Sequence, residues 1–299
     1  MFPYLKISTR TLLVDDDETF VDALSNVIPA RLHPQFCLHP SEVDRALVNE
    51  AELLMREQGL LMALDPSREG PCLARALDFL RSPERREIFT VLVSDHAMPA
   101  EMGAMLCGRH RYAGLRRILL TGAADVDVAV EAFNSGSIDH FLPKQTPLLI
   151  DKLVAVIGDH HCVSAAERGA CLGQFQTAQG RSLLARKEVA DGLSKLLEDL
   201  SVVEYVTLGS PLGVMGLKSD GEAIWIQIEE LESLPLLQSM AGEMGWDQPE
   251  VGRIVSDRLL PNLDLAVQFD GVNPVSVKGL ELAEGVLAGV FPLQQGSAQ

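Results

Sequence analysis

Residues 91–103 read VLVSDHAMPAEMG, and this stretch decides the fold. It continues an apolar, largely β-branched run that begins at Ile88. Such a run predicts a strand that is buried on both faces of a parallel sheet. The run ends at Asp95, and a segment containing Pro and Gly follows it. We therefore expect Asp95 at the carboxyl end of a buried parallel strand.

Three further segments have the same form, a short apolar strand that ends in polar residues. They read LLVDDD at residues 12–17, ILLTGAAD at 118–125 and AFNSGSIDHFLPK at 132–144. A fifth short strand is expected at 35–38, and apolar residues at helical spacing occupy 19–28 and 41–64. Short buried strands that alternate with helices predict an α/β fold, with a doubly wound parallel sheet of five strands.

The polar residues at these strand ends form a coherent chemical set. In an open parallel sheet, ligands bind beyond the carboxyl ends of the strands, so we expect Asp15, Asp16 and Asp95 to meet there. Clustered carboxylates repel one another and favour a cation, and oxygen ligands with room for water suit Mg²⁺. A carboxylate beside Mg²⁺ can attack a phosphoryl group. Lys144 and Thr121 would then supply a positive charge and a hydrogen bond to the phosphoryl oxygens.

Taken together, the four segments resemble the receiver domain of bacterial two-component response regulators. The most specific part is the D-x-x-M-P-x-x-x-G stretch from Asp95 to Gly103, and the resemblance covers about residues 10–158, half of the chain. It implies a signalling phosphoprotein that receives a phosphoryl group from a sensor histidine kinase, with Mg²⁺ as the cofactor. It implies no turnover enzyme beyond phosphorylation and dephosphorylation of the receiver aspartate itself.

The resemblance also assigns a metal site, residue by residue. Asp95 would be the phosphoacceptor and one of the Mg²⁺ ligands. Asp16 would bind the metal directly, and Asp15 would support it through water. The backbone carbonyl of Ala97 would complete the ligands from the protein.

Three more positions match residues that couple phosphorylation to a conformational change in this family. Thr121 and Lys144 would contact the phosphoryl group, and Phe141 matches the aromatic position whose rotamer reports the switch. Two departures from the family pattern are Gln145, where Pro is usual after the Lys, and Gly122, where Ala is more common after the Thr. All of the acids, the Thr and the Lys of the pattern are present.

The domain organisation follows from these segments and from the charge. We expect a receiver domain over 1–160 with a helical insertion at about 49–86, because the chain between Asp16 and Asp95 is roughly twice the family's usual span. A helical connector is expected over 161–200; its 4-3-4 apolar repeat fits either a short coiled coil or packing on its own domain. A smaller α+β domain is expected over 201–299, where strand patterns mix with turns and short helices.

The output of the last domain has two main interpretations, besides a third, which is enzymatic activity or binding of a small ligand. One is protein–protein interaction or homodimerisation, since the domain only loosely resembles a small accessory domain of some receiver proteins. The other is DNA binding through residues 237–258, which resemble a helix-turn-helix; Gln248 would open the recognition helix and Arg253 would face the DNA. Residues 190–299 carry 17 acidic and 5 basic side chains, a net charge of −12, which opposes binding to phosphates.

Overall composition agrees with a soluble signalling protein. The 299 residues include 25 Lys and Arg against 42 Asp and Glu, a net charge of −17, which makes binding of nucleic acid by the whole surface or of an anionic membrane unfavourable. The five cysteines are scattered without a CxxC pair, and no apolar run reaches the length of a membrane span. We therefore expect a cytoplasmic protein with reduced thiols and no membrane partner.

Overall fold

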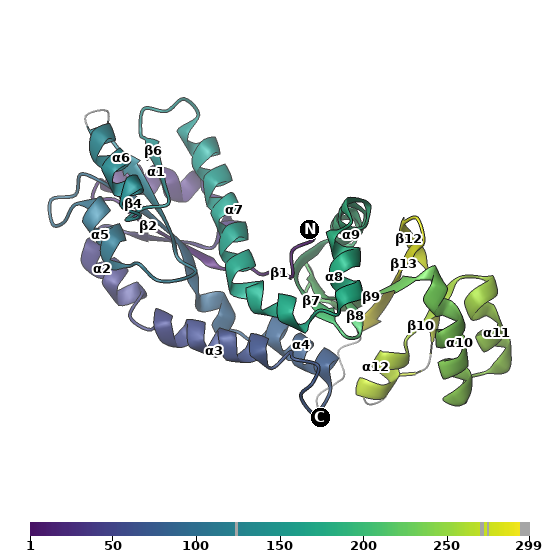
Figure 1. The fold of residues 1–299 in the computed structure, drawn as a ribbon. Helices are drawn as coiled ribbons and strands as arrows, with labels where there is room; N and C mark the ends of the chain where they lie inside the picture. Colours follow the sequence, from purple (N-terminus) through teal and green to yellow (C-terminus); the bar gives the residue numbers. More distant parts are fainter. Residues whose placement is uncertain (123–124, 270–271, 274, 294–299) are drawn as a thin grey trace. The chain divides into compact units, whose positions relative to one another are not determined.

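Segments that are far apart in the sequence share two separate cores (Figure 1). The computed structural model describes residues 1–122, 125–269, 272–273 and 275–293. Ser8–Gln58 and Ser82–Arg168 form one unit, termed the parallel-sheet unit. Met1–Ile7, Gly59–Arg81 and Gly169–Gln299 form the other, termed the antiparallel-sheet unit.

The parallel-sheet unit contains the five predicted strands in the order β3-β2-β4-β5-β6, and every neighbouring pair is parallel. The strands are β2 (Arg10–Val14), β3 (Pro34–Cys37), β4 (Phe89–Asp95), β5 (Arg116–Thr121) and β6 (His140–Pro143). The helices that cover the sheet are α1 (Glu18–Val27), α2 (Pro40–Ala46), α5 (Gly103–Arg109) and α6 (Val126–Asn134), together with α7 (Leu149–Arg168), which follows the last strand. The expected doubly wound parallel sheet is confirmed.

Alternation along the strands explains why both faces of this sheet are covered. Successive side chains of a strand point to opposite faces, so Leu12 and Leu13 of β2 enter different apolar clusters. Leu13 packs with residues of α1 and α7, and Leu12 packs with residues of α2, α5 and α6. Strand β4 is buried along its whole length, as the run of apolar residues predicts.

The helix expected over 41–64 is two helices in the structure, α2 and α3 (Glu50–Met62). Val48 lies between them and is 73% exposed, so the apolar periodicity is interrupted there. The carbonyl oxygen of Asn49 accepts hydrogen bonds from the backbone N–H groups of Glu52 and Leu53. Asn is favourable at such a helix start, which explains why a new helix begins at this point.

The helical insertion contributes to both units. Its helix α4 (Cys72–Arg81) buries Leu73, Phe79 and Leu80 in the core of the antiparallel-sheet unit. The first residues of the chain also belong to that unit, because β1 (Leu5–Lys6) pairs with β7 (Val202–Gly209). Both segments were predicted to belong to the receiver domain, so the division by contacts differs from the predicted boundaries at these places.

The antiparallel-sheet unit contains a six-stranded sheet in the order β1-β7-β8-β9-β13-β12 and a short ladder of β10 with β11. Its further strands are β8 (Leu212–Lys218), β9 (Ala223–Glu230), β10 (Leu259–Pro261), β11 (Ser276–Lys278), β12 (Leu280–Ala283) and β13 (Val286–Leu293). Its further helices are α8 (Ala178–Ala185), α9 (Lys187–Asp199), α10 (Leu234–Glu243), α11 (Gln248–Ser256) and α12 (Leu263–Gln268). The expected α+β class of this second part is confirmed.

The apolar repeat of helix α9 packs against the sheet of its own unit. Val189 and Leu193 are fully buried and pack with Ile226 and Ile228 of β9. The structure therefore favours packing on its own unit over a coiled-coil seam. No described helix is both long enough and apolar enough to cross a membrane.

Buried polar groups lie near the amino-terminal ends of the parallel strands. The ring of His161 on α7 contacts the hydroxyl oxygens of Thr9, Thr11 and Thr90 at 2.7–2.9 Å. Burial lowers the pKa of His161 to about 4, with smaller contributions from neighbouring cationic groups. The ring is therefore neutral at physiological pH and is held by hydroxyl groups.

A second group of buried charges joins α3 to α7 and to β4. Arg168 donates from Nη1 to both carboxylate oxygens of Glu57 at 2.7 Å, and both side chains are buried. Glu50 accepts a hydrogen bond from the backbone N–H of Phe89 at 2.9 Å. Burial raises the pKa of Glu50 to about 8 although this hydrogen bond opposes the shift.

Candidate functional site

Four strands of the parallel sheet end at the same edge, and each brings one part of the candidate site. Asp15 directly follows β2, Asp95 is the last residue of β4, and Thr121 is the last residue of β5. Lys144 directly follows β6. Because parallel strands end together, residues separated by more than a hundred positions meet here.

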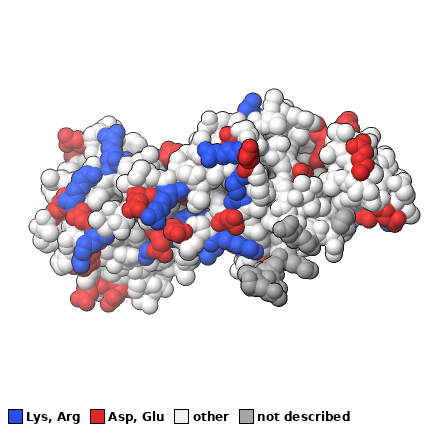
Figure 2. Space-filling view, turned by 90° about the horizontal axis from the view of Figure 1, so that it is seen from below, with Lys and Arg blue, Asp and Glu red and all other residues white. Residues whose placement is uncertain are grey.

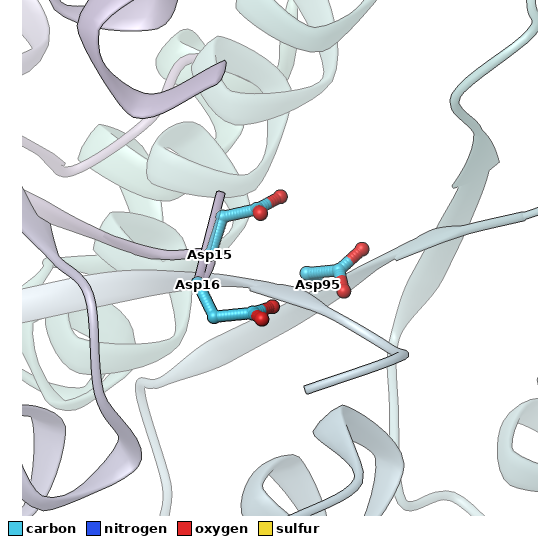
Figure 3. A group of neighbouring side chains, drawn as sticks. All are labelled: Asp15, Asp16 and Asp95. Atoms are coloured by element: carbon cyan, nitrogen blue, oxygen red, sulfur yellow. The ribbon is translucent and has the colours of Figure 1, made fainter. Parts of the chain in front are cut away.

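The three predicted carboxylates form one group (Figure 3). One oxygen from each of Asp15, Asp16 and Asp95 lies within 4.8 Å of the other two. Asp15 and Asp95 are buried, whereas Asp16 is exposed to solvent. Burial raises the pKa of Asp15, and the hydrogen bonds from Lys144 and from the Asp17 backbone oppose the shift. Negative charge is thus concentrated in a place that solvent reaches from one side.

Lys144 bridges the two buried carboxylates. Its Nζ lies 2.7 Å from Asp15 Oδ2 and 2.7 Å from Asp95 Oδ1. Burial alone would lower the pKa of Lys144, but the two carboxylates outweigh it and raise the pKa above its ordinary value. The ammonium group therefore stays charged beside Asp95. It also lies 4.6 Å from the ring centroid of Phe20, a cation–π contact that the sequence analysis missed.

The turn after β4 fixes the Asp95 side chain. The backbone N–H of Ala97 donates to Asp95 Oδ2 at 2.8 Å, so both carboxylate oxygens of Asp95 have a donor. The structure explains why the D-x-x-M-P-x-x-x-G stretch ends in glycine: a Cβ at Gly103 would lie 1.8 Å from the backbone oxygen of Asp95. The helix α5 can begin this close to the strand end only with glycine at that position.

The Thr121 hydroxyl is an unpaired buried group at this edge. Its Oγ1 is buried and has no hydrogen-bond partner among the residues that the structure describes, although a buried hydroxyl is normally paired. The backbone of the same residue is fixed, since its carbonyl accepts from the Lys144 N–H at 2.8 Å. The Thr121 hydroxyl can therefore form a further hydrogen bond at the edge where Asp95 and Lys144 meet.

The donor set fits a magnesium ion. Three carboxylates within reach of one another, one of them exposed, offer the oxygen ligands and the access to water that Mg²⁺ prefers. Lys144 forms ion pairs with one carboxylate oxygen of Asp15 and one of Asp95, but not with Asp16. The ion would be held by Asp15, Asp16 and Asp95, together with the backbone carbonyl of Ala97.

The structure places the other predicted residues as follows. Phe141 lies on β6, is half-buried and packs against the apolar cluster of α2, α5 and α6. Gln145 is exposed directly after Lys144. Asp17 caps α1 by accepting hydrogen bonds from Thr19 N at 3.0 Å and Phe20 N at 3.2 Å, a role that fits an Asp immediately before a helix.

The two residues proposed for DNA contact lie in a different setting. Gln248 is the exposed first residue of α11, and Arg253 of the same helix is exposed. The Arg253 guanidinium donates to Asp257 at 2.7 Å, so its charge is already paired. After α11 the chain enters β10, which pairs with β11, rather than a third helix of a tri-helical unit.

Comparisons with known proteins give a fold match. No protein-family model and no curated protein matches the chain. The solved structure of the Legionella pneumophila response regulator LqsR is similar with a TM-score of 0.70 and 18% identity, covering 98% of this chain and 89% of that one. At this identity the similarity shows a shared fold, and that fold extends over both units.

Solved receiver domains also match about half of the chain. A response regulator receiver domain protein from Clostridium thermocellum has a TM-score of 0.35 and 16% identity, and covers 51% of this chain and 94% of that one. A signal receiver domain from Pseudomonas fluorescens has a TM-score of 0.37 and 21% identity, and covers 54% of this chain and 92% of that one. The match to LqsR, which has the higher TM-score of 0.70, confirms the resemblance to response regulators at the level of the fold.

Proposed function

We propose that this protein is a response regulator of a two-component phosphorelay that accepts a phosphoryl group on Asp95. The observation that carries the proposal is the position of Asp95. Its carboxylate lies beside the Lys144 ammonium, next to two further carboxylates and on the same sheet edge as the unpaired Thr121 hydroxyl. A structural ion pair would need Lys144 and one acid, but not three acids and an orphaned hydroxyl.

The chemical step follows from the groups at this edge. An Asp95 carboxylate oxygen attacks the phosphorus of a phosphohistidine on the kinase, an O–P bond forms, and the P–N bond breaks. The electron pair of that bond goes to the imidazole nitrogen of the leaving histidine. Mg²⁺, when bound, offsets negative charge on the phosphoryl oxygens and the carboxylates.

The protein's own residues then hold the product. Lys144 would move its hydrogen bond from Asp95 to a phosphoryl oxygen, where its positive charge stabilises the added negative charge. The Thr121 hydroxyl would donate to a second phosphoryl oxygen and so gain the partner that it lacks. Because the Lys144 N–H donates to the Thr121 carbonyl, both residues would shift together, and Phe141 on β6, the strand that directly precedes Lys144, would follow.

For the output we propose interaction with another protein rather than binding of DNA. Residues 190–299 carry a net charge of −12, and Arg253 of the helix-turn-helix-like segment is paired with Asp257. DNA binding draws much of its affinity from cations that neutralise phosphates, and few unpaired cations are offered here. A shift in the population of two conformations would control the interaction.

The test is phosphorylation of the full-length protein by acetyl phosphate, followed on a phosphate-affinity gel. We expect a shifted band with Mg²⁺, none with EDTA, and none for Asp95→Asn. Asp22→Asn, an exposed acid on α1, is the matched control and should label like the wild type. Absence of labelling in the wild type, or equal labelling of Asp95→Asn, would reject the proposed function.

A further inference from the structure

Helix α10 presents a row of exposed apolar side chains. Leu236, Met240 and Met244 are spaced four residues apart, so they lie on one face of the helix and its last turn. They are 63%, 42% and 44% exposed. The helix is already anchored by its other face, where Leu237 and Ala241 are buried in the core of the antiparallel-sheet unit. The exposed row, termed the α10 stripe, therefore leaves apolar surface open to solvent in the described part of the chain.

The charged residues of the segment that contains the α10 stripe are all acidic. Residues 219–252 contain eight Asp and Glu and no Lys, Arg or His. Figure 2 shows red side chains and almost no blue at the right-hand end, where Figure 1 places α10 and α11. Glu243 follows Met240 by three residues and is exposed, so it lies beside the α10 stripe. The basic residues that flank this segment are engaged, Lys218 with Glu222 and Arg253 with Asp257.

We propose that the α10 stripe is the docking surface for a basic amphipathic helix of a partner protein. Such a helix carries apolar side chains at positions i and i+4 with Lys or Arg beside them, which matches an apolar row bordered by acids. Methionine side chains are flexible and polarisable, and they suit a surface that receives another helix. The proposal extends the protein–protein output proposed above, but it does not depend on phosphorylation of Asp95.

Charge decides against the other possible occupants. A second copy of the chain in a symmetric dimer would bring the same acids face to face across the α10 stripe, and like charges at an interface are costly. An anionic membrane or a nucleic acid would be repelled for the same reason. The apolar row and the acids beside it both favour a partner helix that carries Lys or Arg beside its own apolar row.

The test uses a fluorescent synthetic helix of Leu and Lys, with Leu at i and i+4 positions, and the full-length protein. Fluorescence anisotropy measures the dissociation constant. Met240→Gln and Leu236→Gln should each weaken binding by about tenfold, because each removes a buried apolar contact. Val255→Gln is the matched control, since Val255 is 42% exposed on the neighbouring α11 and should leave binding unchanged. Added salt should weaken binding as well.

Three results would overturn the proposal. The first is equal binding by Met240→Gln, Val255→Gln and the wild type, which would show that the peptide binds elsewhere. The second is equal affinity for a peptide of Leu and Glu, which would remove the role of charge. The third is a dimer in solution that Leu236→Gln dissociates while peptide binding stays unchanged, which would assign the α10 stripe to a second copy of the chain. All three leave phosphorylation of Asp95 untouched.

Discussion

Replacing Glu50 with Gln should remove a pH-dependent loss of stability from the parallel-sheet unit. Glu50 is 2% exposed, and burial raises its pKa from the ordinary 4.5 to about 8. Between these values the folded protein holds a proton that the unfolded chain has released, so the free energy of unfolding falls as pH rises. One proton corresponds to about 1.4 kcal/mol per pH unit, or about 3 kcal/mol from pH 5 to pH 7.5. Gln keeps an oxygen for the Phe89 N–H and does not titrate.

The assay is urea unfolding of wild type and Glu50→Gln at both pH values, followed by far-UV circular dichroism. The difference in unfolding free energy between the two proteins should change by about 3 kcal/mol in favour of the variant at the higher pH. Trp225 and Trp246 both belong to the antiparallel-sheet unit, so their fluorescence follows that unit separately. Glu52→Gln on the exposed face of α3 is the control. A difference that does not change with pH would refute the reasoning.

Three further substitutions test the site and the core around it. Gly103→Ala should lower stability by about 2 kcal/mol and reduce acetyl-phosphate labelling, because its Cβ would overlap the Asp95 carbonyl; labelling at the wild-type rate would contradict this. Glu57→Gln should cost about 3–5 kcal/mol in urea unfolding because it removes the buried Glu57 charge that pairs with Arg168, and a double change of both residues to Leu should cost less. His161 has a pKa of about 4, so the unfolded chain binds the extra proton between pH 6.5 and 4. Stability should fall over that range by up to about 3 kcal/mol in the wild type and stay flatter in His161→Gln.

The sequence was sufficient for the parallel sheet and for the location of the acids. Buried parallel strands are recognisable from local apolar runs such as 88–93, and their carboxyl ends must meet at one edge, which places Asp15 near Asp95 without any coordinates. Thr121 and Lys144 could be added by the same argument. The contact of Phe20 with Lys144 could not be predicted, because the helical spacing of Phe20 does not distinguish it from a residue of the apolar core.

The sequence alone could not predict that the helical insertion is divided between two cores. The apolar positions of α4 predict a buried helical face, but periodicity does not say which core receives that face. The pairing of β1 with β7 joins residues about two hundred positions apart, and two residues give no strand signal. The division of 41–64 into two helices depends on Asn49 and on the Glu50–Phe89 hydrogen bond, which is a tertiary contact.

The most direct test of the phosphoacceptor assignment is to map the modified residue. The full-length protein is treated with acetyl phosphate and Mg²⁺, reduced with borohydride, digested and analysed by mass spectrometry. Borohydride reduces an aspartyl phosphate to homoserine and leaves free carboxylates unchanged. The arrangement of Lys144, Thr121 and the three acids predicts homoserine at Asp95 alone. Homoserine at Asp15 or Asp16, or at no residue, would contradict it.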